Sequence, residues 1–446
     1  MALHTAGATG PETARTAPAV SRGYAWLVFG LSFGLLLSDY MSRQVLNAVF
    51  PMLKAEWLLS DSQLGSLSGI VALMVGVLTF PLSLAADRWG RVRCLVAAAT
   101  VWSLATLACA VSAGYGAMFA ARFVVGVGEA AYGSVGIAVV VSVFPVGLRA
   151  TLSGAFIGGG AFGSVLGVSV GGVVAGHLGW RWAFGVMGIF GLVLALLYGL
   201  VVTEKRLRRQ RGAAPADARD RPRARGALRP LLPRLFSSVS VNCAYIGSGL
   251  QMFLAMALLA WMPSFLNRYY ALSPSKAGLM AGVFALITGV GMIGGGMLAD
   301  RLGRRVAARK WTVSLFCSVG SVVLLTSGFH LPAGPLQLGL IGVGSLLCNA
   351  TAGPTAAMVA NLTPAALSAT AFATLTLANS LLGLAPGPAV TGMLADRLGL
   401  LDALQLVPLV ALASGAAFAV GRRFYDHDRR RLGLLPAAVR TPQSQP

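Results

Sequence analysis

A chain of 446 residues that is 56% apolar and only 11% charged has the composition of a polytopic membrane protein, which excludes a soluble domain of useful size. A mean hydropathy of +0.75 indicates the same class. The net charge of +21 does not indicate a nucleic-acid partner, because the basic residues gather in short clusters between apolar segments.

Twelve apolar segments are each long enough to cross a bilayer as an α-helix, and lipid favours helices because it cannot hydrogen-bond to an unpaired backbone. The first six are expected at residues 24–50, 62–86, 93–112, 115–143, 150–176 and 181–203. The second six are expected at 236–266, 275–299, 308–328, 335–360, 367–395 and 402–422. We therefore predict an all-α membrane protein with six-helix bundles at 24–203 and 235–422.

The basic clusters predict the topology. Between Glu204 and Arg234, eleven Lys and Arg stand against three acidic residues. All basic clusters fall on one side of the membrane when the segments are counted, and the positive-inside rule makes that side the cytoplasm. We expect a cytoplasmic linker at 204–234 and cytoplasmic tails at 1–23 and 423–446, in the plasma (cell inner) membrane. The first segment lacks a cleavage pattern, so we interpret it as a retained helix.

No sequence pattern indicates a cofactor, a metal or a nucleotide. The five cysteines form no CxxC pair, and the histidines lack metal-ligand spacing. Glycine runs such as Gly158–Gly160 are not followed by Gly-Lys-[Ser/Thr], so they do not indicate a phosphate loop. No nucleophile–base pair lies within the apolar segments, and we expect the protein not to be an enzyme.

A short motif closes the second and the eighth segments, at equivalent places in the two halves. Its residues are Ser83, Asp87, Arg88, Gly90 and Arg91 in the first copy and Gly296, Asp300, Arg301, Gly303 and Arg304 in the second. The eight residues Gly296–Gly303 recur unchanged as Gly392–Gly399 after the eleventh segment. Repeated units of membrane helices are typical of carriers that work by alternating access.

The pattern Gly-x-x-x-Asp-Arg-x-Gly-Arg-Arg resembles the signature loop of the major facilitator superfamily. The second copy matches it fully, whereas the first has Ser83 in place of Gly and Val92 in place of the last basic residue. The resemblance implies a gating motif that latches the two halves together on the cytoplasmic side. With Ser83, the latch of the first half is expected to be looser.

Residues 36–203 are similar to the spinster-like branch of this superfamily. The similarity lies in Leu59–Gly65, Trp102–Thr106, Ala121–Ala130 and Gly179–Phe184, and the related organic-anion symporter branch shares the spacing from Arg122 to Glu129. The first branch implies lysolipids or sphingoid phosphates as substrates, and the second implies sugar acids or carboxylates. Both branches usually carry Asp-Arg in the first segment, where this chain has Ser42 before Arg43.

Four charged residues lie away from the ends of the predicted membrane segments: Asp39 and Arg43 in the first, and Arg122 and Glu129 in the fourth. A charge at mid-membrane costs about 2.5–3.5 kcal/mol, so such residues are usually functional. Each pair has helical spacing, one turn or two turns apart, and therefore projects from one helix face. The first and fourth segments of this superfamily line a central cavity, which implies that the four residues meet there.

The expected roles follow from ionisation. Arg43 and Arg122 stay charged and offer a planar fork that suits a carboxylate or phosphate, so we expect them to hold an anion. Glu129 is our first choice for the proton carrier and Asp39 the second, because a buried carboxylate beside an arginine can titrate as its surroundings change. The alternative is a permanent ion-pair network that clamps the first segment to the fourth.

Further candidates for substrate binding are uncharged. They are Tyr40, Tyr132, Asn242, Tyr245, Asn349 and Asn379. Hydrogen bonds between helices explain the four in the second half about equally well. A charged half opposite an uncharged half suits an anionic amphiphile.

We predict a proton-coupled secondary transporter that moves a small organic anion or a lysolipid-like amphiphile, as a monomer in the lipid bilayer. The alternatives are an exporter of hydrophobic drugs with the same fold and a transport-inactive membrane sensor.

Overall fold

The computed structural model describes residues 22–130, 132–144, 146–204, 236, 238–304, 306–363 and 367–432. All regular elements of these ranges are helices. The predicted basic linker and most of both predicted tails lie outside them.

The first half of the chain, residues 22–204, is described by seven helices. They are α1 (Arg22–Trp57), α2 (Asp61–Trp89), α3 (Arg91–Ala110), α4 (Tyr115–Glu129), α5 (Tyr132–Val143), α6 (Val146–Leu178) and α7 (Trp180–Val201). Local sequence signals fix several boundaries. Ser60 starts α2 with a capping box that includes Gln63. Gly179 has a φ of 89°, which turns the chain sharply between α6 and α7.

The second half, residues 236–432, repeats this order. Its elements are α11 (Val239–Tyr269), α12 (Pro274–Gly303), α13 (Arg309–His330), α14 (Pro335–Asn349), α15 (Ala352–Asn361), α16 (Ser368–Asn379), η4 (Ser380–Leu384), α17 (Pro386–Leu398), α18 (Leu400–Leu406), η5 (Val407–Leu409) and α19 (Val410–Arg431). Ser273 caps α12 as Ser60 caps α2. Gly399 has a φ of 93° at the turn equivalent to that of Gly179.

Ten stretches of the described chain are helical, long and apolar enough to cross a membrane. The predicted segments 115–143 and 367–395 are interrupted instead, and 335–360 also contains a break. Prolines account for two of the interruptions. Pro354 cannot donate a backbone hydrogen bond after the break between α14 and α15, and Pro386 follows the π-helical turn η4.

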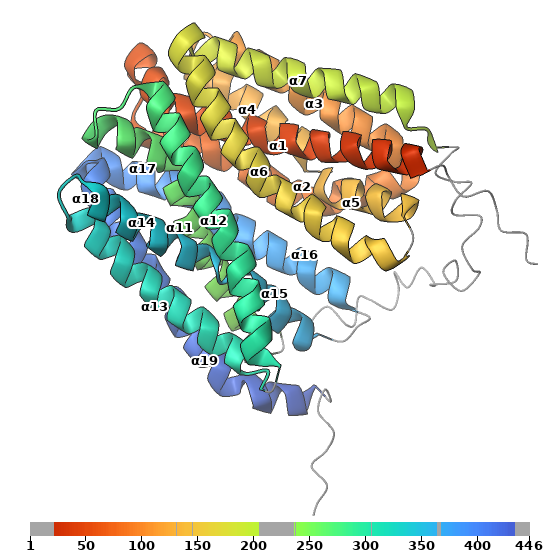
Figure 1. The fold of residues 1–446 in the computed structure, drawn as a ribbon, viewed down its shortest axis with the longest axis vertical. Coiled ribbons are helices and arrows are strands. Elements are labelled where there is room, and N and C mark those ends of the chain that lie inside the picture. The colour runs from red at the N-terminus through yellow and green to blue at the C-terminus, as the bar shows by residue number, and fades with distance from the viewer. Residues whose placement is uncertain are drawn as a thin grey trace, which may run out of the picture.

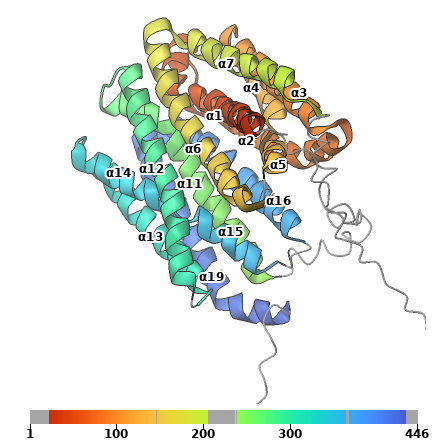
Figure 2. The ribbon, with the colours of Figure 1, turned by 45° about the vertical axis from the view of Figure 1, so that its right-hand side comes forward.

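The helices of the two halves meet at one end and diverge at the other. In Figure 1 those of the first half, red to yellow, run to the right from the meeting point, and those of the second half, green to blue, run downward. Figure 2 shows the same divergence from another side. We call the end where α1 begins and α19 ends the terminal end, and the other end, where the halves meet, the opposite end.

Small residues allow close contact between the halves. A Cβ atom on Gly278 of α12 would lie 2.8 Å from the Cα of Gly172 in α6, so neither position has room for a side chain. Gly65 of α2 packs in the same way against Pro388 of α17. These two helix pairs join the halves, and α1 also contacts α11.

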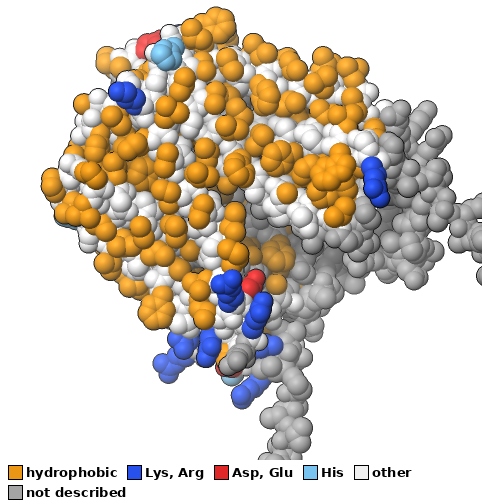
Figure 3. Space-filling view, viewed as in Figure 1, with side chains coloured by type: hydrophobic (Ala, Val, Ile, Leu, Met, Phe, Trp, Pro, Cys, Tyr) orange, Lys and Arg blue, Asp and Glu red, His pale blue; other side chains and the backbone are white. Residues whose placement is uncertain are grey.

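The outer surface suits a lipid environment. Figure 3 shows hydrophobic side chains over this face of the helices, with lysines and arginines gathered at the terminal end of the second half. Large apolar residues such as Leu200 and Phe316 are each 70% exposed. The surface is hollowed between the terminal parts of α6 and α12 (Figure 3). The chain is therefore an integral membrane protein with a divided terminal end.

Candidate functional site

Arg43 bridges two buried carboxylates. Its Nε lies 2.7 Å from Glu129 Oε2 in α4, and its Nη2 lies 3.3 Å from Asp39 Oδ1 and Oδ2 in α1. The side chains of Asp39 and Glu129 are 4% and 0% exposed, whereas that of Arg43 is 18% exposed. The arginine is therefore the accessible member of the group.

The contact between Arg43 and Glu129 is an ion pair without an aligned hydrogen bond. Arg43 Nε and Glu129 Oε2 are buried, and neither has a hydrogen-bond partner of good geometry among the described residues. A buried charged group without an aligned partner gains by accepting a better one. Neither atom therefore gives up an aligned hydrogen bond when it changes partner.

Ser42 supplies the other contact of Glu129. Its hydroxyl donates a hydrogen bond of 2.7 Å to Glu129 Oε1, and its side chain is buried. Sequence reasoning noted Ser42 only as a departure from the usual Asp-Arg pair and gave it no role. The available signal was its position directly before Arg43.

Arg122 is directed at the backbone. Its Nη1 donates to the carbonyl of Ser42 at 2.8 Å, its Nη2 to that of Arg43 at 3.2 Å, and its Nε to that of Leu67 in α2 at 3.4 Å. The residue is 1% exposed. Three donors of the guanidinium thus fasten α4 to α1 and α2 through backbone carbonyls, and the anion-holding role of Arg122 stays a prediction.

The two tyrosines of the first half lie in different surroundings. The guanidinium of Arg43 lies 5.2 Å from the ring centroid of Tyr40, within reach of a cation–π interaction. Tyr132 is fully buried, donates its hydroxyl to the carbonyl of Ser32 and contacts the ring of Trp102 edge-on. Tyr40 therefore belongs to the charged group, and Tyr132 belongs to the core of the first half.

The polar candidates of the second half are dispersed. Asn242 donates to the carbonyl of Phe236 at 2.8 Å near the start of α11, and the Tyr245 hydroxyl donates to that of Ala371 in α16 at 3.4 Å. Asn349 bonds weakly within its own helix. Asn379 is half-buried beside η4, and its Oδ1 has no hydrogen-bond partner among the described residues. Of the four, Asn379 offers a free polar atom.

The break after Glu129 has a counterpart in the second half. The helices α4 and α14 each follow a glycine, Gly114 or Gly334, and end at Glu129 and Asn349 respectively. Equivalent breaks place these two side chains at matching positions of the repeat. The charged residue of the first half thus corresponds to an amide in the second.

A second charged cluster joins the halves at the opposite end. Asp61, at the start of α2, accepts hydrogen bonds from Lys54 Nζ at 2.7 Å and from Arg268 Nη2 of α11 at 2.6 Å. Arg268 belongs to the second half, so this ion pair crosses between the halves. The hydrogen bonds and ion pairs found between described residues of the two halves all lie at this end.

Asp396 completes this connection. Its carboxylate accepts hydrogen bonds from the backbone N–H of Asp61 at 2.6 Å and of Ser62 at 2.9 Å, so it caps α2 from the other half. Burial alone would raise the pKa of Asp396, but the hydrogen bonds from Ser62 and Asp61 lower it overall. Sequence reasoning gave Asp396 no role, although the repeated octapeptide Gly392–Gly399 marked it.

Asp300, a motif residue at the terminal end, is paired within its own half. Asp300 is 73% exposed and pairs with Lys310 of its own half at 3.0 Å. Gly90 has a φ of 100°, and Glu204 accepts the Val92 N–H at 3.1 Å just after it. The other described motif residues lie at the same end: Ser83, Arg88, Arg91, Gly296, Arg301, Gly303 and Arg304. The side chain of Asp87 lies outside the described part.

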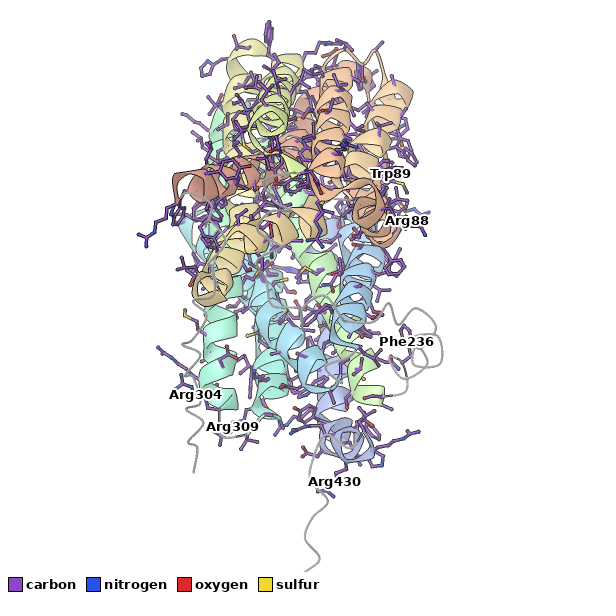
Figure 4. The ribbon with its side chains drawn as sticks, turned by 90° about the vertical axis from the view of Figure 1, so that its right-hand side faces the viewer. Arg88, Trp89, Phe236, Arg304, Arg309 and Arg430 are labelled. Atoms are coloured by element: carbon purple, nitrogen blue, oxygen red, sulfur yellow. The ribbon has the colours of Figure 1, made fainter. Side chains whose placement is uncertain are left out.

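Figure 4 shows the labelled Arg88, Arg304, Arg309 and Arg430 at the outer margins of the terminal end. In the described ranges, no cluster of His, Cys, Asp and Glu could hold a metal ion.

Known transporters share this sequence pattern. The sequence model of the Major Facilitator Superfamily matches residues 32–388. Protein spinster homolog 1 of Homo sapiens is 26% identical over 448 residues, which cover 93% of this chain and 84% of that protein. The Hexuronate transporter of Bacillus subtilis (strain 168) is 24% identical over 292 residues, covering 64% of this chain and 68% of that protein.

Solved structures show the same fold. The crystal structure of a bacterial homolog of the human lysosomal transporter Spinster, in an inward-facing and unoccupied conformation, has a TM-score of 0.82 at 19% identity and covers 92% of this chain and 99% of that chain. The structure of a D-xylose-proton symporter has a TM-score of 0.68 at 18% identity and covers 90% and 96% respectively.

Proposed function

The chain belongs to the major facilitator superfamily and is a spinster-like transporter of small organic substrates rather than an enzyme, and we propose that it moves anions together with protons. In this proposal the paired helices α4–α5, α14–α15 and α16–α17 each count as one broken span. The chain then has twelve spans in two bundles, with both termini in the cytoplasm of the plasma membrane, and acts as a monomer.

The contacts support an alternating-access cycle. The opposite end is held shut by Asp61, Arg268 and Asp396, while Asp300 at the terminal end stands exposed. The terminal end carries the basic clusters, which favours a cytoplasmic location. The arrangement therefore corresponds to an inward-facing state, the state named for the bacterial Spinster homolog. Opening to the outside requires the cluster around Asp61 to separate.

The bridging position of Arg43 is the observation that carries the coupling mechanism. With both carboxylates ionised, Arg43 is shared between Asp39 and Glu129, and the four charges of the group sum to zero. When Glu129 takes up a proton, its attraction for Arg43 is lost and the group gains one positive charge. Arg43 Nε then becomes available to the carboxylate or phosphate of a substrate, which suits the planar guanidinium. Proton and anion binding thereby favour each other.

Two substrate groups fit this chemistry. A hexuronate presents a carboxylate, and the Bacillus subtilis relative is a hexuronate transporter. A lysophospholipid presents a phosphate and an apolar chain, which the uncharged second half would accommodate. Either one would use Arg43, with Tyr40 beside it and Asn379 as a polar contact from the second half.

Transport by purified protein in liposomes tests the proposal. Uptake of radiolabelled glucuronate and of a lysophosphatidic acid is measured with and without an imposed pH gradient, and counterflow is measured without a gradient. We expect accumulation of one substrate under an inward proton gradient. Glu129→Gln mimics the protonated state, so it should keep counterflow and lose accumulation.

Asp39→Asn is the matched comparison, because it removes the other carboxylate that contacts Arg43. It should retain a larger share of gradient-driven uptake than Glu129→Gln. Accumulation by Glu129→Gln at the wild-type level would contradict the role of Glu129. Binding of either substrate without flux or counterflow would contradict transport itself and indicate a sensor.

A further inference from the structure

A groove on the lipid-facing side of the first half lies apart from the charged group. It is a cavity of about 610 Å³ between the terminal parts of α2, α3 and α4, a volume within the usual range for small-molecule sites. Its walls are largely apolar and include Leu82, Ala85, Ala97 and Val101. Trp89 and Val101 are 72% and 39% exposed, so the groove opens toward the surrounding lipid.

The basic residues of the groove lie together at its terminal end. Arg88 and Arg93 flank the turn at Gly90, and both are exposed. Neither guanidinium has an ion pair or hydrogen bond to another described residue. Figure 4 shows Arg88 and Trp89 at the margin of the first half, where the terminal end would meet a bilayer surface. The groove thus offers two exposed cations at its mouth and apolar walls behind them.

The length of the groove suits part of an acyl chain. Along α3 it extends from Arg93 to Val101, which is about 12 Å by the helical rise. Its inner part is lined by Val127 and Gly128 of α4. Gly128 directly precedes Glu129, and it packs so closely on Trp102 that no side chain fits there. An occupant would therefore contact the helix that carries Glu129.

The second half has a smaller cavity at the same end. It has a volume of about 380 Å³ and lies between the terminal parts of α12, α13 and α19, with Arg309 and Arg422 in its lining. Its third wall is α19, whereas that of the first groove is α4, so the two cavities are not equivalent parts of the repeat. The exposed Phe316 of α13 lines the smaller cavity.

We propose that the groove between α2, α3 and α4 binds an anionic phospholipid of the bilayer, with its phosphate at Arg88 and Arg93 and one acyl chain along Ala97 and Val101. Charge complementarity selects the headgroup, since basic pockets between membrane helices attract anionic lipids. The apolar walls hold the chain by the area that they bury. Contact with α4 one residue before Glu129 gives the lipid a route to influence transport.

Lipid counting by native mass spectrometry tests this inference. The purified full-length protein in detergent is titrated with dioleoyl phosphatidylglycerol or with dioleoyl phosphatidylcholine, and the lipids retained per protein are counted. We expect one more phosphatidylglycerol than phosphatidylcholine to be retained at limiting lipid. Arg93→Gln should lower that occupancy about five-fold, because one surface arginine is lost.

Ala97→Phe places a large side chain on the wall of the groove and should lower occupancy at least as much, while Ala97→Leu should have an intermediate effect. Ala97 is exposed, so both variants are expected to fold, and their thermal unfolding is recorded. Arg423→Gln with Arg430→Gln is the control, because it removes two exposed charges at the same end outside the grooves. Equal retention of the two lipids, or wild-type retention by both Ala97 variants, would overturn the proposal. Because binding is read out without transport, the result is independent of the proposed proton coupling.

Discussion

The Ser42 hydroxyl donates a hydrogen bond of 2.7 Å to Glu129, although the two residues stand on different helices. Spinster-like sequences usually have an aspartate where this chain has Ser42. A hydroxyl can support the carboxylate in either protonation state, because it can donate a hydrogen bond or accept one. A second carboxylate at this position would repel the first.

Ser42→Asp should therefore weaken anion transport. It adds a negative charge next to Glu129 and turns the neutral group of Asp39, Arg43, Arg122 and Glu129 into a net anion. We expect the apparent KM for an anionic substrate to rise about tenfold, which corresponds to about 1.4 kcal/mol. Ser42→Thr keeps the hydroxyl and is the control. An unchanged or lower KM in Ser42→Asp would show that the group does not face the substrate charge.

Arg122 and Arg43 should respond differently to replacement by lysine. A lysine side chain could not donate hydrogen bonds to all three carbonyls that Arg122 reaches. Arg122→Lys should therefore lower the free energy of unfolding by about 2 kcal/mol. Arg43→Lys should change stability less and transport more, because it removes the fork proposed to receive the anion. Thermal unfolding in detergent and uptake kinetics separate the two. The opposite ranking would return Arg122 to the role of anion holder.

Tyr132→Phe tests whether Tyr132 serves the core or the substrate. Loss of its hydroxyl removes a buried hydrogen bond to the Ser32 carbonyl, so the protein should be destabilised by about 1 kcal/mol. The apparent KM should stay within about twofold of wild type, since Tyr132 is fully buried. A large rise in KM at unchanged stability would assign the hydroxyl to the substrate.

Asp396→Asn should loosen the opposite end. The substitution removes the charge that caps the N-terminus of α2, an interaction of about 1 kcal/mol, and should shift the equilibrium toward separation about five-fold. Distances between spin labels at Leu58 and Asp402, two exposed positions at this end, report the shift in a background without native cysteines. An unchanged distance distribution would show that Asp396 does not hold the halves together.

The lowered pKa of Asp396 leads to a prediction about the pH dependence of this closure. The pKa of Asp396 lies below its ordinary value of 3.8 in this state. Its stabilisation of the closed opposite end is therefore fully present above pH 3.8 and is lost as the pH falls through the lowered pKa. Label distances should therefore not change between about pH 5 and pH 8. Transport in Asp396→Asn should keep its pH dependence over that range. A pH-dependent separation near neutrality would have to arise from another group.

Helical spacing and the resemblance to the superfamily brought Asp39, Arg43 and Glu129 into one hypothesis, and the structure places both carboxylates in contact with Arg43. The orientation of the Arg122 side chain could not be predicted from the sequence, because its partners are backbone carbonyls that no residue pattern marks. The break after Glu129 was equally hidden within a continuous apolar segment. Their roles in transport remain predictions.

The contacts at the opposite end depended on signals of another kind. Asp61 and Arg268 are 207 residues apart in the sequence, and only the three-dimensional arrangement pairs them. Asp396 lies in an octapeptide whose repetition was visible, but its partner is the backbone at the start of α2. A helix N-terminus is recognisable in sequence, whereas the acid that reaches it from another bundle is not.

The two copies of Gly-Met-Leu-Ala-Asp-Arg-Leu-Gly bear on which face of the transporter is open at rest. One copy docks on the other half through Asp396, whereas Asp300 of the other copy pairs with Lys310 of its own half, although the covalent structures of the two copies are identical. An energy difference between the two faces must then originate in the surroundings of the peptides rather than in the peptides. Substitutions at Lys54 and Arg268, the ion-pair partners of Asp61, should bias which face rests open while both octapeptides stay intact.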